Sequence, residues 1–187
     1  MATSYEAIRR EFAQVQDYII GDLDRLTALE HGGNYIAAAL ITCACDALSY
    51  LKHGKQNEGY RFFEEMLPSE WRPVAKSLYE AIRHGIVHSY DTQLICIGSR
   101  ELDVTISWGQ KPHLHLSADE KHIYVNIKNL SMDFKTAVAQ FKSDLEQQDK
   151  LRDIFAKSIH RSRRLHLRNN ETAKWEQCLK LAKHDAT

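Results

Sequence analysis

Arg83 and His88 are five positions apart in the segment RHGIVH, at the end of a strongly apolar, helix-like pattern. An arginine is always charged, and its planar guanidinium can donate two hydrogen bonds to phosphate oxygens. A histidine, with an ordinary pKa of about 6.5, exchanges protons near neutral pH. Together these side chains suit chemistry on a phosphodiester. The spacing alone carries little weight, because Arg161 and His166 repeat it in a different context.

A single straight helix does not aim both side chains of the motif at one atom. Five residues at about 100° each place Arg83 and His88 about 140° apart around the axis and about 7.5 Å apart along it. The arginine could wrap across the helix, the helix could be distorted near Gly85, or the motif of a second chain could complete the site across a two-fold axis. Gly85 also permits close backbone packing, at a cost of about 1 kcal/mol relative to alanine.

Asp46 is the only charged residue in the apolar stretch 35–51. A carboxylate inside a protein needs a partner charge or several hydrogen bonds, and Arg83 is the candidate partner. In this interpretation Asp46 fixes the guanidinium in place beside a catalytic site. The alternative is that Asp46 lies on a solvated strip near the end of the helix.

The elements that must position these residues are predicted to be helices. Apolar residues recur at helical spacing through most of the chain before residue 90. Gly32, Gly33 and Pro68 interrupt the pattern, and Pro73 suits the first turn of a helix. Four helices are therefore predicted, over about residues 4–29, 35–52 and 58–67 and from residue 73 onward.

A period of two, typical of strands, replaces the helical period after residue 90. Residues 102–108 and 123–127 alternate apolar and polar side chains, and residues 94–97 and 113–116 can add one strand each. Their short connections predict a small antiparallel β-meander.

The fold is therefore predicted to be mainly α. A four-helix bundle over residues 1–90 is followed by the meander over residues 91–130 and by C-terminal helices over residues 131–187, packed on the same domain. Ser131 is expected to cap the first C-terminal helix, and a last amphipathic helix is expected around Trp175.

Length and composition indicate a globular chain without targeting or disulfide features. It has 187 residues, a formal net charge of zero and 43% hydrophobic residues. No apolar run is expected to reach the 18 or so residues of a membrane span, and residues 1–10 lack a signal-peptide core. The cysteines follow no C-x2-C spacing and are expected to be buried thiols. We predict a cytoplasmic protein that engages no membrane.

The segment of residues 157–168 has five cationic side chains and no acidic one. Such a segment could follow the phosphate backbone of a nucleic acid. The candidate RNA-binding residues in it are Arg161, Arg163, Arg164 and Arg168. The alternative is a solvated helix face, or a face that pairs with the acidic first helix.

The chain resembles the HEPN superfamily, all-helical nucleotide-binding and ribonuclease modules of many bacterial toxins and defence systems. The resemblance covers about residues 4–90. It rests on the segment EHGGNY, which leads into the helix with Asp46, and on LYEAI, which runs directly into the motif of Arg83 and His88. The family's R-x4-6-H signature often has Asn, His or Asp directly after the arginine, and His84 fills that position.

The resemblance implies a four-helix bundle that forms a homodimer, brings two motifs into one basic cleft and cuts RNA without a metal or a cofactor. Arg83 and His88 would be catalytic, and His84 would position the phosphate or support the polar network. Asp46 would support Arg83. A toxin or phage-defence context would imply an antitoxin or another regulatory protein as a further partner.

Two other classes of function stay open. His84 and His88 have the i, i+4 spacing of zinc ligands, but Gly85 replaces the glutamate of H-E-x-x-H and no third ligand is evident. The stronger alternative is a non-catalytic module that binds RNA, a nucleotide or a protein partner, because an arginine and a histidine at this spacing do not guarantee turnover.

Overall fold

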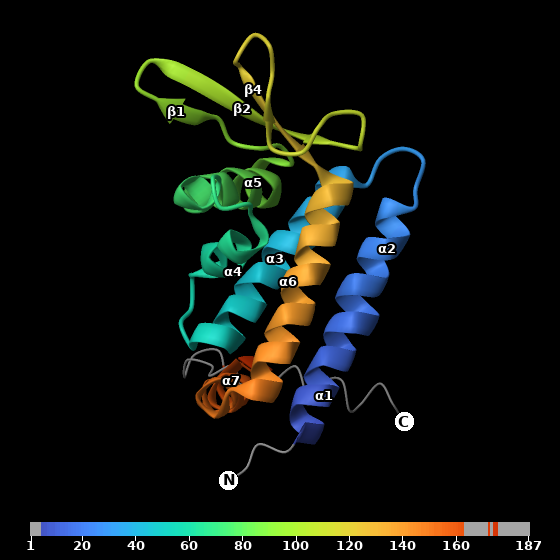
Figure 1. Cartoon of the computed structure of the whole chain (residues 1–187), viewed down its shortest axis with the longest axis vertical. Helices are drawn as coiled ribbons and strands as arrows, with labels where there is room; N and C mark the ends of the chain where they lie inside the picture. Colours follow the sequence, from blue (N-terminus) through green and yellow to red (C-terminus); the bar gives the residue numbers. More distant parts are fainter. Residues whose placement is uncertain (1–4, 163–171, 173, 176–187) are drawn as a thin grey trace.

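The computed structural model of the protein describes residues 5–162, 172, 174 and 175. Most of them are helical, and a small sheet lies at one end of the long helices (Figure 1). The helical segments are α1 (Tyr5–Gln14), η1 (Val15–Ile20), α2 (Gly21–Thr27), α3 (Asn34–His53), α4 (Gly59–Met66), η2 (Arg72–Val74), α5 (Ala75–Ser89), α6 (Ile127–Gln147) and α7 (Asp149–Ser162). The mainly α class predicted from the sequence is confirmed.

The first long helix is continuous but not uniform. α1, η1 and α2 follow one another without a break, and η1 is a π-helical segment. Ile8, Phe12 and Leu23 are buried on its inner side, which accounts for the helical periodicity of the sequence here. Gly33, with a φ of 80°, then lets the chain turn into α3.

α3 lies in the middle of the helices and contacts α2, α4, α5, α6 and α7. It is long and apolar enough to cross a membrane by length and composition alone, with a mean hydropathy of 1.3 over an 18-residue window. No uninterrupted apolar run reaches that length, because Thr42, Asp46 and Ser49 interrupt the helix. The contacts with five other helices account for these apolar side chains, since a helix that is apolar nearly all round packs inside a core.

The sheet has four strands in the spatial order β1 (Ile95–Ile97), β2 (Arg100–Ser107), β4 (His122–Asn126) and β3 (His115–Leu116). β1 pairs with β2 and β3 with β4 in the antiparallel sense, but β2 and β4 are parallel. The predicted antiparallel meander is therefore wrong, and the sheet is mixed. The long connection between β2 and β4 returns the chain to the start of β2, and β3 forms on the outer edge of β4.

α6 begins earlier than the sequence indicates. Asn126 caps it, and the side-chain oxygen accepts hydrogen bonds from the backbone N–H groups of Lys128 and Asn129. Ser131, the predicted cap, is buried inside the helix instead, because β4 runs directly into α6. A short break at Gln148 then separates α6 from α7.

One hydrophobic core joins the helices and the inner face of the sheet. Phe12, Phe141 and Phe155, from α1, α6 and α7, have ring centroids 5.6 to 6.1 Å apart. Val104 and Val125 bring the two central strands into the same core. In the described part of the chain, the bundle, the sheet and the C-terminal helices therefore share one interior.

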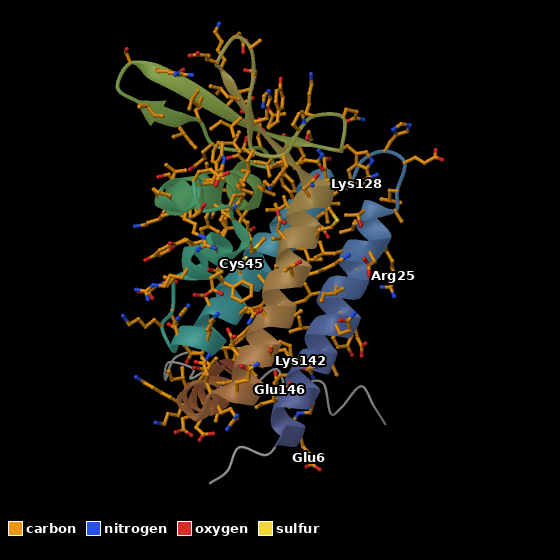
Figure 2. The ribbon with its side chains drawn as sticks, in the orientation of Figure 1. Glu6, Arg25, Cys45, Lys128, Lys142 and Glu146 are labelled. Atoms are coloured by element: carbon orange, nitrogen blue, oxygen red, sulfur yellow. The ribbon has the colours of Figure 1, made fainter. Side chains whose placement is uncertain are left out.

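Only one of the three cysteines in the described part of the chain is buried. Cys45 lies in the interior between the helices (Figure 2), and burial raises the pKa of its thiol. Cys43 and Cys96 are exposed, so the expectation of buried thiols is wrong for these two. Cys178 lies outside the described residues.

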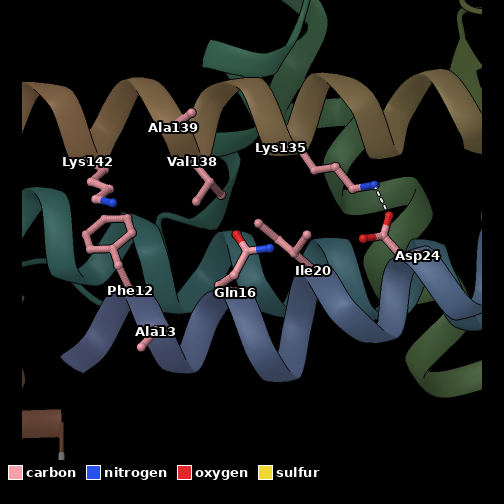
Figure 3. A pocket seen from close by; sticks show the side chains of 9 residues that line it. All are labelled: Phe12, Ala13, Gln16, Ile20, Asp24, Lys135, Val138, Ala139 and Lys142. Atoms are coloured by element: carbon pink, nitrogen blue, oxygen red, sulfur yellow. Dashed lines mark hydrogen bonds and ion pairs between the residues drawn. The ribbon is translucent and has the colours of Figure 1, made fainter. Parts of the chain in front are cut away.

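A cavity of about 630 Å³ lies between the first helix and α6 (Figure 3). Phe12, Ile20 and Val138 give it an apolar lining, and Lys135 forms an ion pair with Asp24 at one end. No histidine, cysteine or hydroxyl-bearing side chain lines it. The candidate chemistry therefore lies elsewhere, on α5, which is on the opposite side of α6 in Figure 1.

Candidate functional site

Arg83 and Asp46 form an ion pair between α5 and α3. Arg83 Nε donates to Asp46 Oδ2 at 2.6 Å, and each side chain is 30% exposed. Burial disfavours the charge on Arg83, but the carboxylate outweighs this effect, so the pKa of Arg83 is raised. Because the pair uses Nε, the two terminal guanidinium nitrogens have no hydrogen-bond partner among the described residues. The partnership inferred from the sequence is present, whereas its part in catalysis stays a prediction.

Tyr79 holds the other oxygen of the same carboxylate. Its hydroxyl donates to Asp46 Oδ1 at 2.7 Å, and the tyrosine is only 4% exposed. Burial, and then the hydrogen bond and the charge of Asp46, raise the pKa of the Tyr79 phenol well above its ordinary value. The sequence interpretation gave Tyr79 no role, although it is four positions before Arg83, and this i, i+4 spacing places both on one face of α5.

Gly59, the first residue of α4, leaves room for this cluster. A side-chain carbon at position 59 would lie 2.3 Å from both Asp46 Oδ1 and the Tyr79 hydroxyl. Only glycine allows such an approach. The sequence interpretation missed Gly59 as well, since its contacts join segments that are far apart along the chain.

Replacing Tyr79 with phenylalanine is expected to remove one component of the pH dependence of stability. The pKa of Tyr79 is higher in the folded state than in the unfolded state, where it is about 10. The contribution of Tyr79 to the free energy of unfolding is therefore fully present below pH 10 and is lost as pH rises above 10. The difference in free energy of unfolding between wild type and Tyr79→Phe should therefore shrink by about 1.4 kcal/mol per pH unit above pH 10. Urea denaturation at several pH values measures it.

The same comparison contains its own control, because the other seven of the eight tyrosines are identical in both proteins. A constant difference between the two proteins from pH 8 to about pH 11 would contradict the assigned environment of Tyr79.

Gly85, inside the motif, packs against the backbone that follows α5. A side-chain carbon at position 85 would lie 2.3 Å from the carbonyl oxygen of Asp91 and 2.6 Å from the nitrogen of Gln93. The Gln93 N–H also donates to the carbonyl of Ala81 at 2.9 Å. Gly85 thus allows the chain to fold back along α5 before β1. The helix runs through this position without interruption, so a break near Gly85 does not bring Arg83 and His88 together.

His84 and His88 are exposed on α5, and their ring centroids are 6.0 Å apart. No interaction joins either ring to Arg83, which points to Asp46 on α3. Within one chain, Arg83 and His88 therefore do not meet at one point. The zinc alternative also lacks a ligand set, since no group of three His, Cys, Asp or Glu residues in the described ranges could hold a metal ion.

Apolar side chains are exposed in the C-terminal half of α5 and at the start of α3. Val87, one turn further along α5, is 47% exposed, and Tyr90 at the end of this helix is 90% exposed. On the neighbouring α3, Ile36 is 63% exposed. Contiguous exposed apolar residues are typical of contact surfaces, and these three side chains are candidates for such a contact.

The basic segment is only partly described. Arg161 lies in the last turn of α7, whereas Arg163, Arg164 and Arg168 lie outside the described residues. The RNA-binding role of these four arginines stays a prediction.

Comparison of the chain with protein-family models, curated proteins and solved structures gives no match. The resemblance to the HEPN superfamily therefore stays a prediction from the sequence.

Proposed function

We propose that the chain is a metal-independent endoribonuclease of HEPN type. The observation that supports this most is the setting of Arg83. Asp46 holds its Nε at a partly exposed position and leaves both terminal nitrogens unpaired, while His84 and His88 are exposed on the same helix. A guanidinium fixed in this way can take two phosphate oxygens, and an exposed imidazole can exchange protons.

The proposed reaction is a transesterification within the RNA strand. His88 removes the proton of a ribose 2′-hydroxyl, whose oxygen attacks the adjacent phosphorus. The bond from phosphorus to the 5′-oxygen breaks, and the leaving oxygen takes a proton from a second imidazole. Arg83 stabilises the charge on the pentavalent phosphorus, and His84 positions the phosphate. The products have a 2′,3′-cyclic phosphate at one end and a 5′-hydroxyl at the other.

The proposed site includes two copies of the chain. Arg83 and His88 diverge on α5, so a second motif related by a two-fold axis supplies the missing partner and the second imidazole. The exposed side chains of Ile36, Val87 and Tyr90 would then lie at or near the contact between copies. We further propose that this homodimer acts in the cytoplasm, in a toxin or defence context, and that an antitoxin or another regulatory protein restrains it.

The decisive experiment is incubation of the purified protein with a labelled structured RNA in EDTA, beside the matching DNA. We expect cleavage of the RNA alone, with cyclic phosphate ends identified by mass spectrometry. DNA lacks the 2′-hydroxyl nucleophile and should stay intact. Equal cutting of DNA, or cutting only when a divalent metal is added, would contradict the mechanism.

A non-catalytic binding module is the second candidate. It is favoured by the divergence of Arg83 and His88 in one chain, because a monomer with this geometry could hold a phosphate but not cut it. RNA binding without cleavage, by a protein that stays monomeric at all concentrations tested, would select this function over the ribonuclease.

A further inference from the structure

The outer face of the sheet is polar and aromatic, whereas its inner face is apolar. Val104 and Ile106 of β2, and Val125 of β4, point into the core. Helices α3, α5 and α6 contact the sheet and lie below it in Figure 1. The alternate residues of β2 and β4 therefore point away from the helices, and His122 and Tyr124 are half-buried among them.

His122 and Tyr124 form a stacked pair of neighbouring rings. Their planes differ by 13° and their centroids are 6.1 Å apart. Because the two residues are i and i+2 on one strand, both rings stand on the same side of the sheet. This stacked pair of rings is the platform, and a flat molecule can stack on a ring face that is turned away from the partner ring.

The ring of His122 is held in place by polar contacts. Its Nδ1 lies 3.0 Å from Asp103 Oδ2, and Thr105 Oγ1 lies 3.1 Å from the same carboxylate oxygen. Asp103 is directly opposite His122 on β2, and Thr105 is opposite Tyr124. The platform is therefore fixed by its neighbours across the strand pair before any ligand arrives.

Lys111 and His115 lie beside the Tyr124 end of the platform. Lys111 Nζ is 5.3 Å from the centre of the Tyr124 ring, which shows that a polar group can reach this ring face. His115 is exposed and is opposite Tyr124 on β3. These residues also line a shallow recess of about 520 Å³, together with Ser117 and His122. A lysine that leaves the ring can pair with a phosphate next to a stacked base.

The His122 end of the platform carries carboxylates together with Lys121 and the ion pair of Arg100 with Glu120. Asp119 accepts a hydrogen bond from Ser117, and this bond, together with one from the backbone N–H of Lys121, lowers the pKa of Asp119. Asp103 lies at the same end, beside His122. The carboxylates of Asp103 and Asp119 disfavour a phosphate directly beside them, so the phosphate is placed beside Lys111.

We propose that the outer face of the sheet binds a single-stranded nucleic acid, with bases stacked on Tyr124 and His122 and a backbone phosphate beside Lys111 and His115. Stacking on an aromatic ring needs the face of a base and not its edge, so the site accepts different bases. It does not need a 2′-hydroxyl, and it excludes double helices, whose base faces are covered. The site is separate from the Arg83 motif, because α5 contacts the sheet from its inner side.

The test is fluorescence anisotropy with a labelled eight-nucleotide single-stranded DNA. DNA cannot be cut by the reaction proposed for α5, so failure of the ribonuclease proposal leaves this measurement unchanged. Tyr124→Ala is expected to weaken binding about 5- to 150-fold, the range for loss of one base stack, and Tyr124→Phe to retain it. Lys111→Gln should lower the slope of log affinity against log salt by about 0.7, the value for one phosphate contact.

The matched control is Tyr60→Ala on α4, where Lys76 Nζ lies 5.6 Å from the Tyr60 ring. This pair repeats the tyrosine and lysine arrangement without the second parallel ring, so its loss should leave the affinity unchanged. Circular dichroism confirms that each variant is folded. Equal binding by folded wild type and Tyr124→Ala, equal loss in the Tyr60 variant, or equal affinity for a double-stranded oligonucleotide would each overturn the proposal.

Discussion

Replacing His88 with alanine is expected to reduce RNA cleavage by about 10²- to 10⁴-fold, the usual contribution of a general acid or base. The imidazole is exposed on α5 and packs into no core, so the variant should fold and assemble as the wild type does. Single-turnover cleavage of a labelled RNA in EDTA measures the change. His31→Ala, which removes an exposed histidine from the loop between α2 and α3, is the matched control and should cut at the wild-type rate.

Mixing two inactive variants distinguishes a shared site from a site within one chain. A heterodimer of Arg83→Ala and His88→Ala keeps one intact arginine and one intact histidine, on different chains. If Arg83 and His88 act together across the two-fold axis, the mixture regains part of the wild-type activity, reduced by the loss of the second His88 as proton donor, while each variant alone stays inactive. No recovery after subunit exchange, verified by native mass spectrometry, would contradict the composite site.

Replacing Gly85 with alanine is expected to lower the free energy of unfolding by about 3 kcal/mol. The added carbon would lie 2.3 Å from a backbone oxygen of Asp91 and 2.6 Å from the Cα of Thr92. These are main-chain atoms, and they cannot rotate away as the end of a side chain would. The collision outweighs the gain of about 1 kcal/mol that alanine normally brings inside a helix. Urea denaturation measures the loss.

Gly21 provides the comparison, since it is also a glycine inside a continuous helical run. The nearest atom to an added carbon there is the backbone oxygen of Gln16, at 3.6 Å, and its φ of −60° suits any residue. Gly21→Ala should therefore stabilise the protein, by up to about 1 kcal/mol. If both glycine variants changed stability in the same direction and by similar amounts, the close backbone approach at Gly85 would be contradicted.

The candidate site was predictable where a residue broke a local pattern. Asp46 is the only charge in an apolar stretch, and burial of that stretch requires a partner for it. Arg83 lies in the second half of α5, another helix with an apolar stripe, and the two side chains do meet, at 2.6 Å. Tyr79 and Gly59 were not predictable in the same way, because their types are ordinary for a helix and their role depends on contacts across three helices.

The sequence by itself determined where most helices and strands lie, because periodicity relates residues that are neighbours along the chain. It also determined that Asp46 in α3 needs a partner, because the residues around it are apolar. Only the tertiary structure decided the strand order, the start of α6 and the direction of Arg83 relative to His88. The parallel pairing of β2 with β4 depends on where a long connection returns, and the tight approaches at Gly59 and Gly85 depend on segments that meet only in the folded chain. Such contacts produce no repeating pattern in the sequence, since each is made once, between residues that are far apart along the chain.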